Sequence, residues 1–127
     1  KISHNIPKHL IITGNYTLLY SIFHNIVENA INYVEKAEIT IQLTHQDPGS
    51  VYFSISDNGQ GIPTDALAHI FERFYRVDKG RSRKAGGTGL GLSIVKHAVI
   101  FHGGKITAVN RTEGGLEFQF SLARRAK

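Results

Sequence analysis

The apolar residues of this chain recur with two different periods, and this change of period constrains the fold more than any other feature. Between residues 18 and 31 they are spaced three and four apart, which predicts an amphipathic helix from an N-cap at Asn15 to about Tyr33. Residues 38–44 and 51–56 instead alternate between apolar and polar side chains, and a turn with Pro and Gly separates them. This arrangement predicts an antiparallel hairpin after the helix.

The same two periods return in the second half of the chain. Residues 93–101 have helical spacing and end at a pair of glycines, while 105–110 and 116–122 alternate. A short strand at 10–13 and a short helix over 64–71 complete the prediction. We therefore expect an α/β two-layer sandwich, with a mixed, mostly antiparallel sheet of about five strands covered on one face by about three helices.

Length and composition fit one domain. The 127 residues contain no cysteine and no apolar run long enough for a membrane helix. We expect residues 1–9 to be a linker, 10–123 the domain and 124–127 a basic tail. The formal charge is +5, but six of the 15 Lys and Arg residues lie within residues 73–84, and no aromatic residue separates the basic ones from 76 onward. This clustering favours a small polyanion over nucleic acid as ligand.

A glycine-rich stretch, 86–92, precedes the second long helix. Four glycines in six positions let the backbone approach a ligand, and the N–H groups of the helix that follows point back toward them. A phosphate chain suits such a site, although by itself the stretch is equally compatible with a plain helix cap. The spacing matches neither the P-loop nor the dinucleotide-binding motif.

The first long helix has polar residues where a plain amphipathic helix needs none. Asn25 and Asn29 are four residues apart, and Glu28 and Asn32 lie beside them on one polar strip. Two amide oxygens at this spacing can bind one Mg²⁺ and leave room for phosphate oxygens. The alternative is a solvated helix face.

A carboxylate and two glycines follow the second strand of the first hairpin. Asp57 could accept a hydrogen bond from an exocyclic amine, and Gly59 and Gly61 would let a flat ring approach the backbone. Adenine fits both features, whereas Asp-Asn-Gly alone is more often a simple turn.

Farther on, 71–76 combines aromatic residues and arginines beside a polar segment, 75–85, that we predict to be a lid. Core packing is a simple alternative for the aromatic residues.

With these four stretches in this order, the chain resembles the catalytic ATP-binding domain of bacterial sensor histidine kinases, in the wider family of gyrase-type and heat-shock chaperone ATPases. The resemblance covers residues 15 to 122. It implies that Asn25 and Asn29 hold Mg²⁺, that Tyr33 lies against adenine, and that Asp57 binds the adenine amine above Gly59 and Gly61. It also implies that Arg76 reaches the terminal phosphates.

The resemblance implies a larger nucleotide-binding set, and Asn29, Arg76 and Glu28 are the catalytic candidates within or beside it. The cofactors would be ATP and Mg²⁺, the latter held by Asn25 and Asn29. The remaining candidates for nucleotide contact are Asn32, Tyr33, Asp57, Gly59, Gly61, Ile62, Arg73, Phe74, Gly87, Thr88, Gly89, Leu90 and Gly91.

The family transfers the γ-phosphoryl group to a histidine on a separate helical domain, which we expect to precede this one in a longer parent protein. His24 is a poor candidate for that acceptor, since the resemblance puts it inside the nucleotide domain. The expected partners are this phosphoacceptor domain and, through it, a response regulator. We expect the isolated domain to be a cytoplasmic monomer, with membrane attachment only through other parts of a sensor protein.

Two departures keep alternatives open. Asn32 stands where many members have lysine, and Leu116 and Glu117 replace hydroxyl residues that are common near the adenine. A nucleotide-binding module that signals by conformation without phosphotransfer, or a related ATPase, therefore remains an alternative to a kinase.

Overall fold

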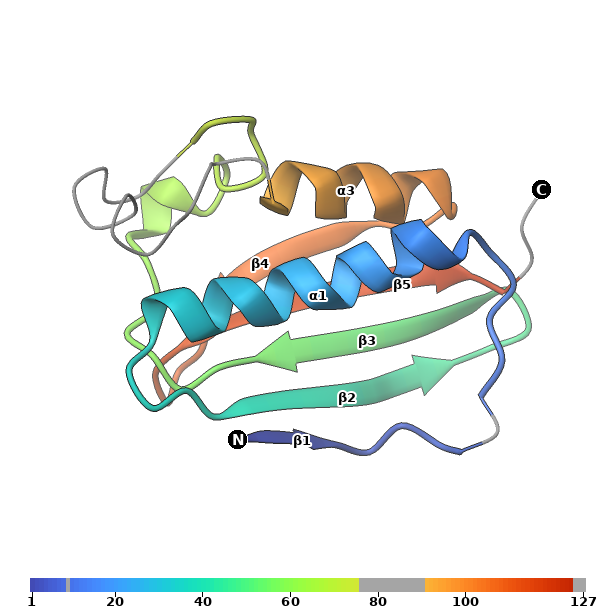
Figure 1. Cartoon of the computed structure of the whole chain (residues 1–127), viewed down its shortest axis with the longest axis horizontal. Helices are drawn as coiled ribbons and strands as arrows, with labels where there is room; N and C mark the ends of the chain where they lie inside the picture. The colour runs from blue at the N-terminus through green and yellow to red at the C-terminus, as the bar shows by residue number, and fades with distance from the viewer. Residues whose placement is uncertain (9, 76–90, 125–127) are drawn as a thin grey trace.

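In a computed structural model the chain forms a two-layer α/β sandwich, and the structure describes residues 1–8, 10–75 and 91–124 (Figure 1). Both α-helices lie over the same face of one sheet. The predicted fold is confirmed, although the described residues form two α-helices and one 3-10 helix rather than about three helices. The elements in chain order are β1 (Ile2–His4), α1 (Tyr16–Tyr33), β2 (Ile39–Gln46), β3 (Ser50–Ser56), η1 (Thr64–Ala66), α3 (Gly91–Phe101), β4 (Ile106–Asn110) and β5 (Leu116–Ala123).

The sheet has five strands in the order β1-β2-β3-β5-β4. β1 pairs with β2 in parallel, and the other neighbours are antiparallel, with Ile55 of β3 opposite both Ile41 and Phe118. Alternate residues of the central strands face the helices and are buried, as the sequence period predicts. Phe23 of α1 packs against this core. Its ring is edge-on to the Phe53 ring, with 5.5 Å between the ring centroids.

Helix α1 begins where the sequence predicts. The side chain of Asn15 accepts a hydrogen bond from Leu18 N at 2.9 Å, which satisfies one of the free donors of the first turn. The buried positions Ile22, Ile26 and Ala30 are four residues apart and form the core-facing stripe. No helix among the residues described is both long and apolar enough to cross a membrane.

Two predicted elements are wrong. Residues 2–4, expected within a linker, form β1, because Ile39 N donates to the Lys1 carbonyl and Asn5 N donates to Ile41 O along the edge of β2. Residues 10–13 form no strand, and Leu10 and Ile12 instead pack against the core as an irregular segment. Residues 2–4 form a strand because they pair with the edge of β2, and a strand of three residues is too short to show a period in the sequence.

The predicted helix over 64–71 is shorter than expected. Only Thr64–Ala66 is helical, and successive hydrogen bonds from Leu67, His69 and Glu72 reach back three residues instead of four. The buried side chains of Ala66 and Ile70 anchor this run of turns to the core.

A buried histidine ties the end of α3 to the start of α1. His102 Nε2 accepts a hydrogen bond from Asn15 N at 3.0 Å, and His102 Nδ1 bonds the Ala98 carbonyl at 2.8 Å. Because a backbone N–H can only donate, the proton of this neutral ring must be on Nδ1. Gly14 lies beside the ring, since a Cβ at Gly14 would come within 2.5 Å of it.

Candidate functional site

The described site candidates lie mainly on three elements, which are the loop after β3, helix α1 and the start of α3. The loop after β3 lies at the same end of the sheet as the β4–β5 turn (Figure 1). Two clusters can be followed in detail. One is centred on Asp57, directly after β3, and the other on Asn25 in α1.

Asp57 is buried, with 6% of its surface exposed, and its position is fixed from several sides. Its Oδ1 accepts hydrogen bonds from Gly59 N at 2.9 Å and Leu116 N at 3.2 Å. Its own N–H donates to Leu116 O at 3.0 Å, so the residue is part of the β3–β5 pairing. Within the part of the chain that the structure describes, Oδ2 receives no hydrogen bond. One carboxylate oxygen therefore holds the fold while the other can accept a bond from a ligand.

The two glycines after Asp57 fit closely against neighbouring side chains. A Cβ on Gly59 would lie 2.7 Å from Val34 Cγ2, and Gly61 has a φ of +78° with Asn110 Oδ1 where a Cβ would be. Glycine is the residue that tolerates such a backbone and such contacts. From the sequence, these glycines are expected to let a flat ring approach the backbone. In the structure, close contacts with Val34 and Asn110 also require glycine at both positions.

The β4–β5 turn contributes residues that the sequence analysis misses. Asn110 Oδ1 accepts from Ile62 N at 2.9 Å while its Nδ2 donates to Ile62 O at 2.7 Å. Arg111 Nη1 donates to the Asp57 carbonyl at 2.8 Å. The only sequence signal is a polar stretch, residues 110–113, before a Gly-Gly pair, which is also typical of an ordinary hairpin.

The polar strip of α1 lies beside the start of α3. Asn25 Nδ2 donates to the Ser21 carbonyl at 2.9 Å, and its Oδ1 faces Gly91, where an added Cβ would be 3.2 Å away. Asn29, one turn on, is half-buried, whereas Glu28 and Asn32 are exposed. The asparagine spacing thus places an amide oxygen next to the first residue of α3.

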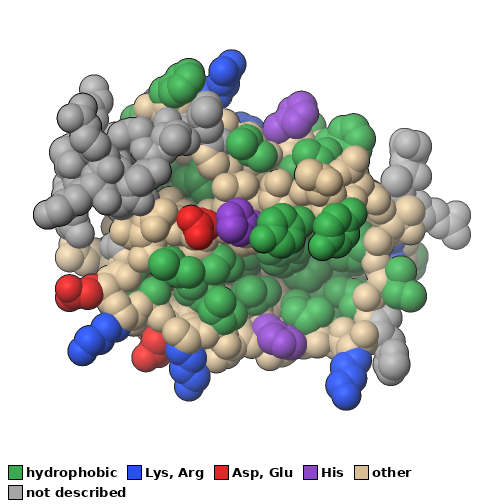
Figure 2. Space-filling view, in the orientation of Figure 1, with side chains coloured by type: hydrophobic (Ala, Val, Ile, Leu, Met, Phe, Trp, Pro, Cys, Tyr) green, Lys and Arg blue, Asp and Glu red, His purple; other side chains and the backbone are tan. Residues whose placement is uncertain are grey.

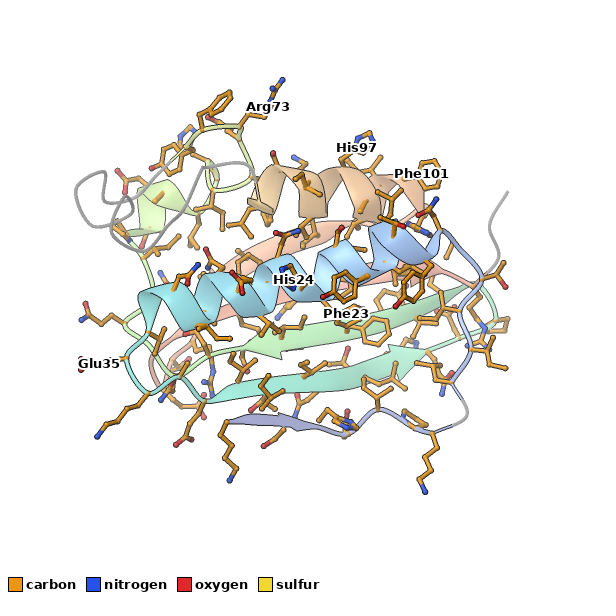
Figure 3. All side chains as sticks on the ribbon, in the orientation of Figure 1. Phe23, His24, Glu35, Arg73, His97 and Phe101 are labelled. Carbon is orange, nitrogen blue, oxygen red and sulfur yellow. The ribbon has the colours of Figure 1, made fainter. Side chains whose placement is uncertain are left out.

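His24 belongs to a different surface. It is exposed, its ring stacks on Tyr20 with centroids 5.2 Å apart, and its Nδ1 lies 3.4 Å from Tyr20 Oη. Figure 3 shows His24 on the outer side of α1, and Figure 2 shows hydrophobic side chains gathered along this surface. The stack continues to Tyr16, whose ring centroid is 6.4 Å from that of Tyr20.

The aromatic and basic segment before residue 76 divides into two parts. The Phe71 ring packs edge-on against Phe118 at 6.0 Å, as the core-packing alternative proposes. Phe74 is exposed, has a φ of +67°, and lies 5.4 Å from the Arg73 guanidinium. Arg73 points away from the body of the domain (Figure 3), so neither Arg73 nor Phe74 is brought to Asp57 here.

Several predicted residues lie outside the described part of the chain. These are the lid segment from residue 76 onward and the nucleotide-contact candidates Arg76, Gly87, Thr88, Gly89 and Leu90. For Tyr33 the structure describes the backbone at the end of α1 and not the side chain. Their predicted contacts therefore remain predictions.

Residues 14–126 match a family model described as "Histidine kinase-, DNA gyrase B-, and HSP90-like ATPase". The chain belongs to this ATPase family. Within it, the domain resembles the catalytic ATP-binding domain of sensor histidine kinases, as the order of the motifs predicts. Its fold matches the catalytic domain of histidine kinase ThkA with a TM-score of 0.80 at 29% identity, over 97% of this chain and 77% of that chain.

Two longer proteins support the same assignment. The chain is 36% identical to the sensor-like histidine kinase SenX3 of Mycobacterium tuberculosis over 116 residues, 91% of this chain and 28% of that protein. It also matches full-length ShkA in complex with AMPPNP, with a TM-score of 0.78 at 31% identity over 100% of this chain and 26% of that chain. The chain thus spans about a quarter of the length of such relatives.

Proposed function

We propose that this domain binds Mg-ATP and donates the γ-phosphoryl group to a histidine on a separate helical domain of the same parent protein. Through that domain it would act on a response regulator in two-component signal transduction. The relatives named as sensor histidine kinases support this assignment. We also propose that the parent protein is anchored in a membrane, with this domain facing the cytoplasm.

The observation that carries the proposal is the divided role of the Asp57 carboxylate. Oδ1 is bonded to Gly59 N and Leu116 N, which fixes the direction of the group. Oδ2 is left to accept a hydrogen bond from the exocyclic amine of adenine. Asp57 is buried, so such a bond would be little weakened by competition with water. A charged acceptor of fixed direction selects a base that has an amine at that position.

The metal part of the proposal rests on the α1 strip. Asn25 and Asn29 offer amide oxygens, which are ligands that Mg²⁺ accepts beside phosphate oxygens and water. The bond from Asn25 Nδ2 to Ser21 O turns its oxygen toward the start of α3, where the N-terminal N–H groups of the helix favour anions. The residues present therefore fit the ion. When bound, Mg²⁺ would neutralise charge on the phosphates.

The transfer itself needs little covalent chemistry from this domain. A nitrogen of the acceptor imidazole forms a bond to the γ-phosphorus, the bond from that phosphorus to the β–γ bridging oxygen breaks, and ADP leaves. The imidazole gives up its N–H proton in the process. Catalysis is then mainly positioning and charge neutralisation. Glu28 is exposed on α1 near Asn29, and a role in accepting this proton is compatible with that position.

A second candidate function is an ATP-binding module that does not transfer phosphate. Asn32 favours this candidate, because it is exposed on the α1 strip and offers no positive charge where many family members have lysine. The two candidates predict the same nucleotide binding and differ only in transfer. They can therefore be separated by the fate of the γ-phosphate.

The first experiment measures the melting temperature of the domain with ATP, with and without Mg²⁺. A ligand that binds only the folded state raises the melting temperature. Asn29→Ala should remove most of the Mg²⁺-dependent part of the shift, while Thr17→Ala, at an exposed position of the same helix, should leave it unchanged. A parent domain with no Mg²⁺-dependent shift would overturn the proposed metal site.

The second variant is Asp57→Asn. Its Oδ1 can still accept from Gly59 N and Leu116 N, so the fold should persist. The affinity for ATP should fall by about 10- to 100-fold, since a charged hydrogen bond contributes roughly 1.5–3 kcal/mol. Unchanged ATP affinity would rule out Asp57 as the adenine-binding residue.

The third experiment adds the helical phosphoacceptor domain of the parent protein. Acid-labile phosphate on that domain, dependent on ATP, is expected for a kinase. Mg-ATP binding without any labelled acceptor would favour the silent module instead.

A further inference from the structure

We propose that Asn110 and Arg111, at the start of the β4–β5 turn, are positioning residues that set the base selectivity of the site. They would do so by holding residues 57–62, the loop that carries Asp57. This inference rests on the proposed function, because it takes Asp57 to be the residue that binds the base.

Asn110 holds the far end of the loop. Its amide oxygen accepts from Ile62 N at 2.9 Å and its amide nitrogen donates to Ile62 O at 2.7 Å, so one side chain satisfies both backbone groups of one residue. An uncharged side chain needs both a donor and an acceptor to do this, and among side chains of this length only Asn offers them in one plane. Asn110 thus acts on Ile62 as a neighbouring strand would.

Arg111 holds the near end of the loop. Its Nη1 donates to the Asp57 carbonyl at 2.8 Å, while Nη2 lies 3.4 Å from the Glu113 carboxylate. The guanidinium is half-buried, which strengthens a charge-assisted bond. Asp57 is also bonded to Leu116 through its backbone and its carboxylate. The β4–β5 turn and the first residue of β5 therefore hold both the carbonyl and the carboxylate of Asp57 in place.

Gly61 is matched to this arrangement. Its φ of +78° and the position of Asn110 Oδ1 leave no room for a side chain, so the loop can reach Asn110 only with glycine at this position. Three contacts at residues 57, 61 and 62 thus link one loop to one turn. Because hydrogen bonds weaken steeply with distance and angle, a loop released from this turn would direct the Asp57 carboxylate less accurately.

The test compares ATP with inosine triphosphate, which has a carbonyl oxygen in place of the exocyclic amine. Dissociation constants for both are measured by calorimetry on the parent domain, Asn110→Ala and Arg111→Ala. We expect the parent to prefer ATP. Each variant should lose about tenfold in ATP affinity, the equivalent of one hydrogen bond, and much less in affinity for inosine triphosphate. The preference for ATP should therefore shrink.

Three further variants separate positioning from plain stability. Thr107→Ala alters an exposed residue of the same strand and should keep the parent's selectivity. Asn110→Asp can still accept from Ile62 N and cannot donate to Ile62 O, so its selectivity should be intermediate. Arg111→Lys keeps the charge without the planar guanidinium, and it provides the measurement if Asn110→Ala does not fold.

Two outcomes would overturn the inference, and they can be told apart. If the parent prefers ATP and the variants keep that preference while only their melting temperatures fall, the turn has a structural role alone and the proposed function stands. If the parent binds neither nucleotide, the proposed function fails and the inference fails with it.

Discussion

The two hairpin turns of the sheet, at its opposite ends, use their side chains differently (Figure 1). The β2–β3 turn is closed by its own residues, since Asp47 Oδ1 accepts from Gly49 N and Ser50 N, both at 2.8 Å. The β4–β5 turn is closed by backbone bonds from Arg111 N to Gly115 O and from Gly114 N to Arg111 O. Its side chains are directed instead to the loop that follows β3.

This difference separates a turn that only connects strands from one that is part of a site. In the first turn, the Asp47 side chain satisfies local backbone donors, which is ordinary turn chemistry. In the second, Asn110 and Arg111 bond residues about 50 positions away in the sequence. Substitutions in the β4–β5 turn should therefore change nucleotide binding, and those in the β2–β3 turn should change stability alone.

The largest effect is expected from Gly115→Ala. Gly115 has a φ of +99°, and a Cβ there would collide with the carbonyl oxygen of Asp57. We expect a loss of about 3 kcal/mol in the free energy of unfolding and loss of ATP binding. Denaturant unfolding and calorimetry measure the two effects.

The matched control is Gly49→Ala in the other turn. There the nearest atom to an added Cβ is Asp47 Oδ1 at 3.6 Å, an ordinary contact. Stability should change by less than about 0.5 kcal/mol and ATP affinity should not change. Equal effects of the two alanines would remove the distinction between the turns.

A smaller effect is expected from Gly61→Ala. The positive φ and the contact with Asn110 Oδ1 should together cost about 2 kcal/mol in unfolding free energy and weaken ATP binding. Combination with Asn110→Ala should be non-additive, because both changes act on one contact. Strict additivity in a double-mutant cycle would show that Gly61 and Asn110 act independently.

The smallest effect is expected from Asp47→Asn. Hydrogen bonds from Ser50 N and Gly49 N, with His45 and Arg124 nearby, lower the pKa of Asp47 from its usual 3.8. Because the folded pKa is below the unfolded one, this stabilisation is present above about pH 4 and is lost as the pH falls through the folded pKa. The parent should therefore lose stability in acid, and Asp47→Asn should lose less.

The measurement for Asp47 is the melting temperature from pH 7 to pH 2, with ATP affinity at pH 7 as the second readout. ATP affinity should equal that of the parent. A change in affinity would contradict the view that the β2–β3 turn only connects strands.

Local patterns were sufficient to predict most of the fold. The helical period and the Asn15 cap place α1, and alternation places four strands, since each of these signals depends on neighbouring residues alone. The short strand β1 could not be predicted, because its three exposed residues have no period and pair only through the edge of β2. The left-handed backbone of Phe74 likewise has no local sign in the sequence.

Site residues could be predicted where the residue type and its position in the sequence indicate the chemistry. Asp57 after a strand and Asn25 on a helix were found in this way, and the structure places Asp57 directly after β3 and Asn25 against Gly91 at the start of α3. Asn110 and Arg111 were missed because their partners are distant in sequence. Their function depends on how β4 and β5 pair with the rest of the sheet, which no local window contains.

The hydrogen bonds of the buried His102 fix the C-terminal end of helix α3, while its N-terminal end, at Gly91, lies next to Asn25. The helix has 11 residues, which at 1.5 Å per residue makes it about 16 Å long. A tilt of about 10° around His102 would therefore displace Gly91 by about 3 Å, more than the range over which a hydrogen bond survives. A tilt of α3 about its His102 end would thus change which atoms Asn25 contacts at Gly91.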